Sequence, residues 1–271
     1  MMIYQERIKA VIFDWAGTVI DYGCFAPMHA FIQTFEEAGV PITIREARMP
    51  MGLLKWDHIQ AILQMERVNS VWTAAFGKQA VKEDIDRLYV RFEAILMESL
   101  KQYTDPIPGA LETVRKLRDA GIAIGSTTGY TSGMMEVIVP EAKRKGYSPD
   151  FMVASDQVKA GRPYPYMILQ NLVELGIYPP KSVIKVGDTV SDIQEGRNAG
   201  VWTVAVIQGS SELGLTQAEV ESMHADELAE RMNQTRLTFE QAGADYIIGS
   251  ITQLPAVIEE LERSGLERGM K

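Results

Sequence analysis

Four groups of polar residues in the sequence combine the side chains that phosphoryl transfer requires. Each group follows a short apolar run, and open α/β sheets bind their ligands at the carboxyl ends of the strands. Two carboxylates from different strands can hold a magnesium ion through oxygen ligands, while a hydroxyl and a cation bind the other oxygens of a phosphoryl group. One group alone would be an ordinary turn or surface feature, but together they predict a phosphoryl-transfer site. The groups are Asp14, Thr128, Arg162 and the segment 187–192, which contains Asp188 and Asp192.

Strands and helices in alternation must position these side chains. Segments of helical period separate short runs rich in β-branched and apolar residues, a pattern that predicts a parallel sheet. In one such segment Leu111, Val114 and Leu117 share a face, and Gly121 provides a stop. We therefore expect an α/β fold with a Rossmann-like parallel sheet. The expected strands are residues 8–13, 122–127, 151–154, 183–186, 202–206 and 246–248.

The stretch after the first expected strand breaks this alternation, because it has helical patterns and no convincing strand. Thr43 and Glu46 can form a capping box, and residues 85–96 carry a long apolar stripe. We expect an inserted α-helical cap domain at residues 21–102. The α/β core then comprises residues 1–20 and 103–271. A polar segment of helical pattern at 209–243 contains no residue pattern that indicates a particular chemistry.

The composition narrows the possible partners and the compartment. The chain has 271 residues, of which 46% are apolar, and 27 basic against 36 acidic residues give a formal charge of −9. This profile excludes a disordered chain and argues against nucleic-acid binding. No apolar run approaches the roughly 20 residues that a membrane helix needs, and no secretion signal is recognisable. The one cysteine, Cys24, cannot form an intrachain disulfide, which suits a reducing cytoplasm.

The order of the four motifs around a helical insert resembles the haloacid dehalogenase superfamily over nearly the whole chain. The resemblance implies that Asp14 attacks phosphorus to form an aspartyl-phosphate. It also implies that Thr128 and Arg162 bind the phosphoryl oxygens and that Asp188 holds magnesium. Asp192 matches a supporting acidic position, whose contact with the metal is direct or through water.

Ala16 departs from the pattern of phosphatases in this superfamily, which have an aspartate there as the general acid for an alkoxide leaving group. Alanine cannot donate a proton, so the leaving group needs another kind of help. Lys55, between Leu54 and Trp56, could form an imine with a carbonyl and accept the electrons of a carbon leaving group. If this segment is helical, Met51 and His58 share the face of Lys55, and His58 could shuttle protons.

Motifs in both expected domains together resemble the phosphonatase family more specifically than the superfamily. The resemblance implies hydrolysis of phosphonoacetaldehyde to acetaldehyde and phosphate, through an imine on Lys55 and usually in a homodimer. It also implies magnesium at Asp14, Asp188 and the backbone carbonyl of Ala16, with Gly129 beside Thr128 in the phosphate site. The motifs are the segments 14–18 (DWAGT), 51–55 (MGLLK), 125–130 (GSTTGY) and 161–165 (GRPYP).

Two other functions remain open at the level of the sequence. A magnesium-dependent phosphatase or phosphomutase could use Asp14 on a small phosphate ester without the usual acid. A catalytically silent member could keep the motifs only to maintain the fold. The roles of Cys24 and Tyr130, which lie beside motif residues, are also left open.

Overall fold

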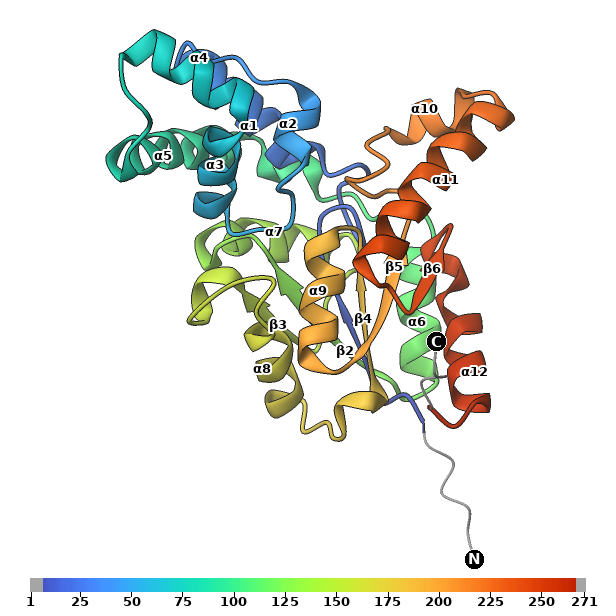
Figure 1. Cartoon of the computed structure of the whole chain (residues 1–271). Coiled ribbons are helices and arrows are strands. Elements are labelled where there is room, and N and C mark those ends of the chain that lie inside the picture. Colours follow the sequence, from blue (N-terminus) through green and yellow to red (C-terminus); the bar gives the residue numbers. More distant parts are fainter. Residues whose placement is uncertain (1–6, 267–271) are drawn as a thin grey trace, which may run out of the picture.

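Six parallel strands form one sheet in the order β3-β2-β1-β4-β5-β6 (Figure 1). The structure is a computed structural model that describes residues 7–266. All six expected strands are present, so the predicted α/β class is confirmed. The strands are β1 (Ala10–Phe13), β2 (Ala123–Thr128), β3 (Phe151–Ala154), β4 (Val183–Gly187), β5 (Trp202–Val206) and β6 (Tyr246–Ile248).

The strand order reverses at β1, where the chain first adds β2 and β3 on one side and then β4, β5 and β6 on the other. Phe13 at the end of β1 is in register with Ser126 of β2 and with Val186 of β4. The residues that follow these three strands therefore emerge at the same edge of the sheet. A crevice at such a reversal is where open α/β sheets bind ligands.

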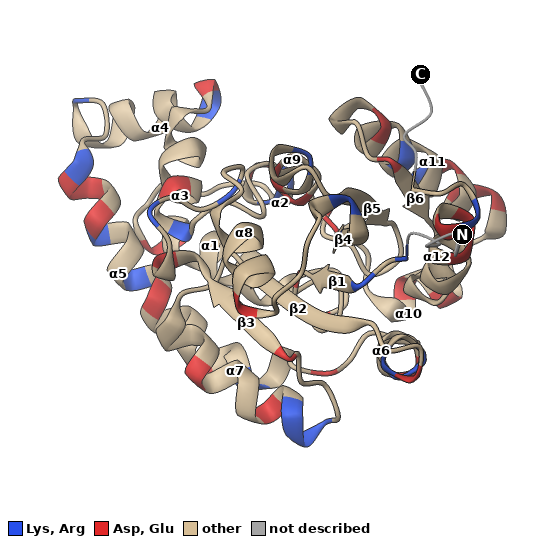
Figure 2. Ribbon diagram, turned by 90° about the horizontal axis from the view of Figure 1, so that it is seen from below, with Lys and Arg blue, Asp and Glu red and all other residues tan. Residues whose placement is uncertain are grey.

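Helices cover both faces of the sheet (Figures 1 and 2). On one face α8 contacts β2 and β3 while α9 contacts β4 and β5, and on the other face α6 contacts β2. Charged residues are concentrated on the helices, and the strands are nearly free of them, as burial on both faces requires (Figure 2). No helix in the described part of the chain has both the length and the apolarity to span a bilayer. The helices of the sheet domain are α6 (Ala110–Asp119), α7 (Ser132–Arg144), α8 (Tyr166–Glu174), α9 (Val190–Ala199), α10 (Gln217–Ser222), α11 (Ala225–Ala242) and α12 (Leu254–Arg263).

Five further helices lie between β1 and β2 in the sequence and gather at the carboxyl edge of the sheet (Figure 1). Residues 21–102 contain no strand. Phe31 is central to their packing, because its ring stacks on His58 at 3.8 Å and on Phe92 at 4.2 Å between centroids. The predicted capping box of Thr43 and Glu46 is confirmed. The helices are α1 (Phe25–Glu37), α2 (Ile44–Arg48), α3 (Lys55–Gln64), α4 (Glu66–Phe76) and α5 (Lys82–Ser99).

The two connections between this helical insertion and the sheet run side by side. The N–H of Ile107 donates to the carbonyl of Val19 at 2.9 Å, and the N–H of Asp21 donates to the carbonyl of Asp105 at 3.2 Å. Entry and exit of the insertion are therefore adjacent in space. The domain boundaries at 20/21 and 102/103 remain a prediction.

Candidate active site

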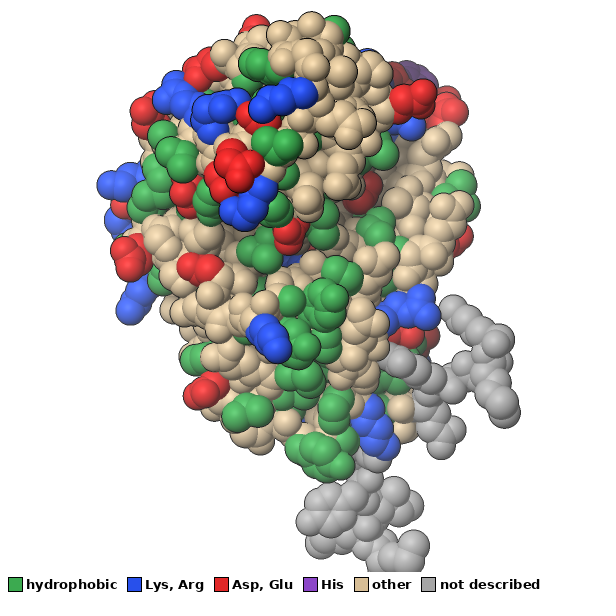
Figure 3. Space-filling view, turned by 60° about the vertical axis from the view of Figure 1, so that its left-hand side comes forward, with side chains coloured by type: hydrophobic (Ala, Val, Ile, Leu, Met, Phe, Trp, Pro, Cys, Tyr) green, Lys and Arg blue, Asp and Glu red, His purple; other side chains and the backbone are tan. Residues whose placement is uncertain are grey.

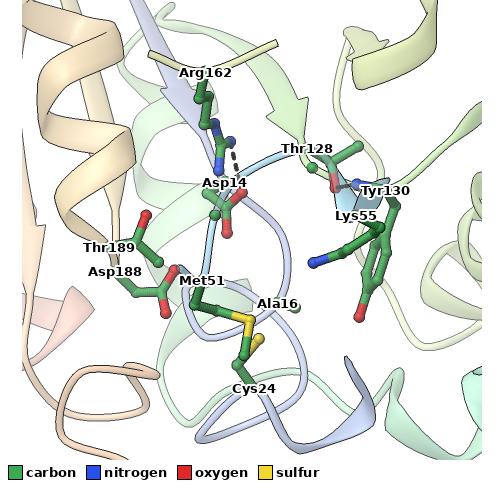
Figure 4. Close-up of a pocket in the computed structure, with 12 residues that line it drawn as sticks. Asp14, Ala16, Cys24, Met51, Lys55, Thr128, Tyr130, Arg162, Asp188 and Thr189 are labelled. Carbon is green, nitrogen blue, oxygen red and sulfur yellow. Dashed lines mark hydrogen bonds and ion pairs between the residues drawn. The ribbon is translucent and has the colours of Figure 1, made fainter. Parts of the chain in front are cut away.

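A pocket at the carboxyl edge of the sheet brings together nearly all of the predicted site residues (Figure 4). It lies between the sheet and the insertion. Of the residues named in the sequence analysis as catalytic, phosphate-binding or metal-binding, all but His58 and Asp192 line it. The lining residues are Asp14, Ala16, Cys24, Met51, Gly52, Lys55, Thr128, Gly129, Tyr130, Arg162, Asp188 and Thr189.

Asp14 lies directly after β1, and its backbone N–H donates to the carbonyl of Val186 at 2.9 Å. Its Oδ1 accepts a hydrogen bond from Nη2 of Arg162 at 2.7 Å (Figure 4). Burial, together with the neighbouring Asp192, raises the pKa of Asp14, although the charge of Arg162 opposes this. The arrangement holds a carboxylate beside a guanidinium that can also bind the oxygens of a phosphoryl group.

Asp14, Asp188 and Asp192 form a buried cluster whose ligating oxygens lie within 4.8 Å of one another. Burial and the charges of Asp14 and Asp192 raise the pKa of Asp188 well above its usual value. A β-carbon at Gly17, where φ is +87°, would lie 2.2 Å from Oδ2 of Asp188, so the glycine leaves room for this carboxylate. A set of carboxylate oxygens in a buried cradle fits a hard divalent cation.

Asp192 differs from the other two carboxylates because one of its oxygens is paired with two cationic side chains. Oδ1 forms ion pairs of 2.9 Å with Nη1 of Arg162 and with Nζ of Lys185. Oδ2 accepts from the hydroxyl of Thr189 at 2.6 Å and from its backbone N–H at 3.2 Å. Burial works against its charge, but Arg162 and Lys185 outweigh this effect and hold the pKa of Asp192 below its usual value.

Lys185 and Glu195 extend this network below the pocket, and the sequence analysis did not single out either residue. Lys185 is fully buried in β4, and its Nζ donates to Oγ1 of Thr127 at 2.7 Å. Oε2 of Glu195 accepts from Nε of Arg162 at 2.9 Å and from Oγ1 of Thr127 at 3.2 Å. In the sequence, the one signal for this network is that Lys185 interrupts an otherwise apolar run.

Lys55 is the first residue of α3, and its side chain is only about 5% exposed. Its Nζ lies 5.2 Å from the ring centroid of Tyr130 (Figure 4). The distance from Nζ to the ring centroid of Phe31 is 5.9 Å. Burial lowers the pKa of Lys55, since the charged amine loses its hydration. A larger fraction of the neutral, nucleophilic amine is therefore present than in an exposed lysine.

Met51 reaches the pocket from a turn, since α3 begins only at Lys55. The conditional expectation that Met51 shares a helical face with Lys55 is therefore wrong. The turn passes through Gly52 at φ +90°, a conformation that favours glycine and allows no continuous helix. A β-carbon at Gly52 would lie 2.5 Å from Oγ1 of Thr189, and one at Gly129 would lie 3.1 Å from the carbonyl oxygen of Leu53. The turn therefore packs closely against two loops of the sheet edge.

His58 is buried behind the pocket, one turn after Lys55 in α3. Its Nε2 lies 2.8 Å from the carbonyl oxygen of Ala47, which requires a proton on Nε2. Burial and the charge of Lys55 hold the pKa of His58 well below its usual value, so the ring is neutral. Its Nδ1 is buried without a partner.

The remaining predicted residues occupy the loops around these groups. Oγ1 of Thr128 accepts from the backbone N–H of Tyr130 at 3.1 Å, at the end of β2. Arg162 lies eight residues beyond the end of β3, in the loop before α8. Burial opposes its charge, but the surrounding carboxylates raise the pKa of Arg162. Cys24 and Tyr130 also line the pocket, and burial raises the pKa of both well above their usual values.

Comparison with known proteins identifies the class to which this fold and site belong. The family model of haloacid dehalogenase-like hydrolases matches residues 8–200. The chain belongs to this class and is an enzyme. A structure titled phosphonoacetaldehyde hydrolase-like protein from Oleispira antarctica superposes with a TM-score of 0.94 at 39% identity, covering 97% of this chain and 95% of the other. A β-phosphoglucomutase from Clostridium difficile shares the fold, with a TM-score of 0.68 at 17% identity.

Within that class the chain belongs to the phosphonoacetaldehyde hydrolase family. It is 53% identical over 257 residues to the phosphonoacetaldehyde hydrolase of Bacillus cytotoxicus, covering 95% of this chain and 97% of the relative. The enzyme of the same name from Bacillus cereus is 53% identical over 260 residues. A bifunctional phosphonoacetaldehyde hydrolase/aminoethylphosphonate transaminase from Clostridioides difficile is 50% identical over 98% of this chain. The chain spans 42% of the length of that relative.

Proposed function

We propose that this hydrolase cleaves the carbon–phosphorus bond of phosphonoacetaldehyde with water, giving acetaldehyde and phosphate. The observation that carries the proposal is the buried amine of Lys55 in the same pocket as Asp14, with Ala16 where a phosphatase of this class needs an acid. An alkoxide leaving group needs a proton donor, whereas a carbanion needs an electron acceptor. The site offers the second and lacks the first.

Lys55 supplies the electron acceptor as an imine. Its neutral amine attacks the aldehyde carbon, water leaves, and the protonated imine stands one carbon away from the carbon–phosphorus bond. When that bond breaks, its electron pair moves toward the imine nitrogen and gives an enamine. Protonation of the enamine carbon and hydrolysis of the resulting imine release acetaldehyde and restore Lys55.

Asp14 takes the phosphoryl group. An oxygen of its carboxylate attacks phosphorus as the carbon leaves, and Arg162 and Thr128 bind the other phosphoryl oxygens, with Gly129 beside them. The aspartyl-phosphate is then hydrolysed by water to phosphate and free Asp14. Arg162 is well placed for this role, because its guanidinium lies within 2.7 Å of Asp14 and is held from behind by Asp192 and Glu195.

Asp14, Asp188 and the backbone carbonyl of Ala16 would hold a magnesium ion. When bound, the ion offsets the negative charge of the phosphonate against that of the attacking carboxylate. Because Oδ1 of Asp192 is paired with two cations and Oδ2 accepts from Thr189, we assign Asp192 to the support of Arg162 and Lys185 rather than to direct metal contact.

His58 and Met51 complete the imine side of the pocket in this proposal. The neutral His58 ring, with a free Nδ1, lies one turn from Lys55 and is assigned to proton transfer during imine formation and hydrolysis. Met51 lines the pocket beside Cys24 (Figure 4). We propose that the insertion, residues 21–102, is a cap domain that brings Lys55 to Asp14. Closure of this cap then assembles the site and excludes water.

The test separates the imine from the phosphoryl chemistry. Wild type, Lys55→Arg and Asp14→Ala are incubated with phosphonoacetaldehyde and borohydride and examined by mass spectrometry, while acetaldehyde and phosphate are assayed in parallel. We expect a reduced adduct on Lys55 in the wild type and in Asp14→Ala, with turnover abolished in Asp14→Ala, and neither adduct nor product in Lys55→Arg. Normal cleavage by Lys55→Arg would refute the imine route, and activity on phosphate esters in that variant would favour a phosphatase.

We also propose a cytoplasmic homodimer. The free, buried Cys24 is compatible with a reducing compartment. An exposed apolar stripe on α8, formed by Tyr166, Leu169 and Val173, supports a contact between two copies of the chain. Hydrophobic side chains gather on the lower part of the corresponding face of the molecule (Figure 3).

A further inference from the structure

Arg48, at the end of α2, joins the insertion to a loop on the sheet side of the molecule. Its Nη1 donates to the carbonyl of Gly23 at 2.8 Å and to that of Ser211 at 2.9 Å, and its Nη2 donates to the carbonyl of Gly214 at 3.4 Å. The guanidinium also lies 5.0 Å from the ring centroid of Phe25. One side chain therefore binds the entry to the insertion and both ends of the segment 211–214.

The same segment binds Asp188. The backbone N–H of Ser211 donates to Oδ2 of Asp188 at 2.8 Å. The hydroxyl of Thr18 donates to Oδ1 at 3.3 Å, so the short Ser211 bond is the closer of the two contacts. The orientation of the Asp188 carboxylate thus depends on where the backbone of Ser211 lies.

Hydrogen bonds within the loop and bonds to the insertion hold this position together. The N–H of Gly214 donates to the carbonyl of Ser210 at 3.0 Å, and the N–H of Leu213 donates to Oγ of Ser210 at 2.9 Å. The N–H of Gly23 donates to the carbonyl of Gly209 at 2.7 Å, which ties the loop again to the entry of the insertion. Gly214 has φ +67°, and a β-carbon there would lie 3.1 Å from Nε of Arg48, so the glycine lets the guanidinium approach the backbone. Several of the contacts that fix the segment 209–214 from outside thus come from the insertion and its entry.

We propose that Arg48 is a positioning residue that couples docking of the insertion to the orientation of Asp188 through the segment 209–214. This inference rests on the proposed function of Asp188 as a metal ligand. When Arg48 binds the carbonyls of Ser211 and Gly214, the Ser211 N–H is fixed toward Oδ2 of Asp188. The orientation of Asp188 toward the metal site therefore depends on docking of the insertion. This gives the segment 209–214, which carries no sequence motif, a place in catalysis.

The test measures metal binding by the full chain without substrate. Mn²⁺ is titrated into wild type, Arg48→Met and Arg48→Lys, and free Mn²⁺ is followed by electron paramagnetic resonance. We expect Arg48→Met to weaken Mn²⁺ binding by about tenfold, at the low end of what loss of an outer-sphere contact does to a metal site. Arg48→Lys, which keeps the charge but reaches fewer carbonyls, is expected to lie between the two. The matched control is Arg45→Met, an exposed arginine on the same helix, which is expected to bind Mn²⁺ as the wild type does.

Equal Mn²⁺ affinity in folded Arg48→Met and wild type would overturn the proposal, because a purely structural contact would leave the metal site unchanged. If Arg48→Met does not fold, Gly214→Ala replaces it, since the added methyl group displaces Arg48 without altering a metal ligand. Asp188→Asn separates the assignment of Asp188 as a metal ligand from the role of Arg48. Unchanged Mn²⁺ binding in that variant would overturn the metal assignment and the role of Arg48 together, whereas lost binding there with normal binding in the Arg48 variants would overturn only the latter.

Discussion

Lys185 is the only charged residue in the six described strands. It is fully buried, and so are the acidic groups it faces, Asp192 at 2.9 Å and Glu195 at 3.5 Å. A buried charge is tolerated only where partners offset it, so the cluster of Lys185, Arg162 and these two carboxylates must act as a unit. Its consequence for the site is that Arg162 has a fixed orientation toward Asp14.

This unit predicts strong coupling between Lys185 and Glu195. Lys185→Met and Glu195→Gln each leave an uncompensated buried charge, so each is expected to lower the free energy of unfolding by about 3–5 kcal/mol. The double variant removes one charge of each sign, and it is expected to lose clearly less than the sum of the two. Urea denaturation of the four proteins measures the coupling. Additive losses would show that the two side chains do not form a unit.

At the scale of residues, the sequence predicted the groups that face the substrate better than those that support them. Asp14, Thr128, Arg162 and Asp188 follow strands and so could be expected at one edge of a sheet. Lys185 stands out as a charge inside an apolar run, but its role depends on partners in α9 and β2 that only the packed structure brings within 3.5 Å.

At the scale of elements, the carboxylate of Asp21, at the entry to the insertion, binds the first turn of α1, which begins at Phe25. Asp21 has φ +53°, and its two oxygens accept from the N–H groups of Phe25 at 3.0 Å and Ala26 at 3.1 Å. These bonds satisfy free donors of the first turn. Burial nevertheless dominates and raises the pKa of Asp21 to about 7.

The raised pKa predicts how stability changes with pH. Below the unfolded pKa of 3.8 both states are protonated, whereas between about 4 and 7 only the unfolded state ionises, so stability falls as the pH rises through this window. The full effect is at most about 4 kcal/mol. Asp21→Asn cannot ionise. Its unfolding free energy is therefore expected to rise relative to the wild type between pH 4 and pH 8, as measured by urea denaturation at constant Mg²⁺.

A difference between Asp21→Asn and the wild type that stays constant across this pH range would contradict the prediction. The asparagine can replace only one of the two hydrogen bonds. That loss does not vary with pH, so it shifts the comparison without altering its slope. Ionisation of Asp21 is thereby separated from its role as a helix cap.

Elements with a strong local signal were predictable, and those set by close packing were not. The strands follow from runs of β-branched residues, and the capping box follows from Thr43 and Glu46 three positions apart. The start of α3 depends on how tightly the turn at Gly52 packs against Thr189 and Gly129, which lie far away in the sequence. No local pattern contains that information.

At the scale of the whole molecule, the site exists because the insertion and the sheet meet. Asp14 and Asp188 come from the sheet edge, whereas Lys55 and Met51 come from the insertion. The sequence indicated which segments carry chemistry but not that the loop at 209–214 would contact both Asp188 and the insertion. That placement rests on contacts such as Arg48 with Ser211, 163 residues apart.

The outer face of α8 presents a second whole-molecule feature, an apolar surface without charged side chains along the helix until Glu174. Val173 is 76% exposed, Tyr166 40% and Leu169 38%, and the spacing of three and four residues places them on one face. Tyr164 stacks on Tyr166 with 5.8 Å between ring centroids and widens the patch. A two-fold contact would set one such stripe against its copy, which is the commonest arrangement in homodimers.

Val173→Asp tests whether two copies meet at this face. In a symmetric contact the substitution brings two buried carboxylates close together, so we expect sedimentation velocity to show a dimer for the wild type and a monomer for the variant at micromolar concentration. The side chain is exposed in the single chain, so the monomer is expected to keep its fold and its melting temperature. The matched control is Val90→Asp on α5, which is 67% exposed but lies in the insertion, away from α8. A monomeric wild type would remove the dimer proposal, and an unchanged dimer in Val173→Asp would move the contact to another surface.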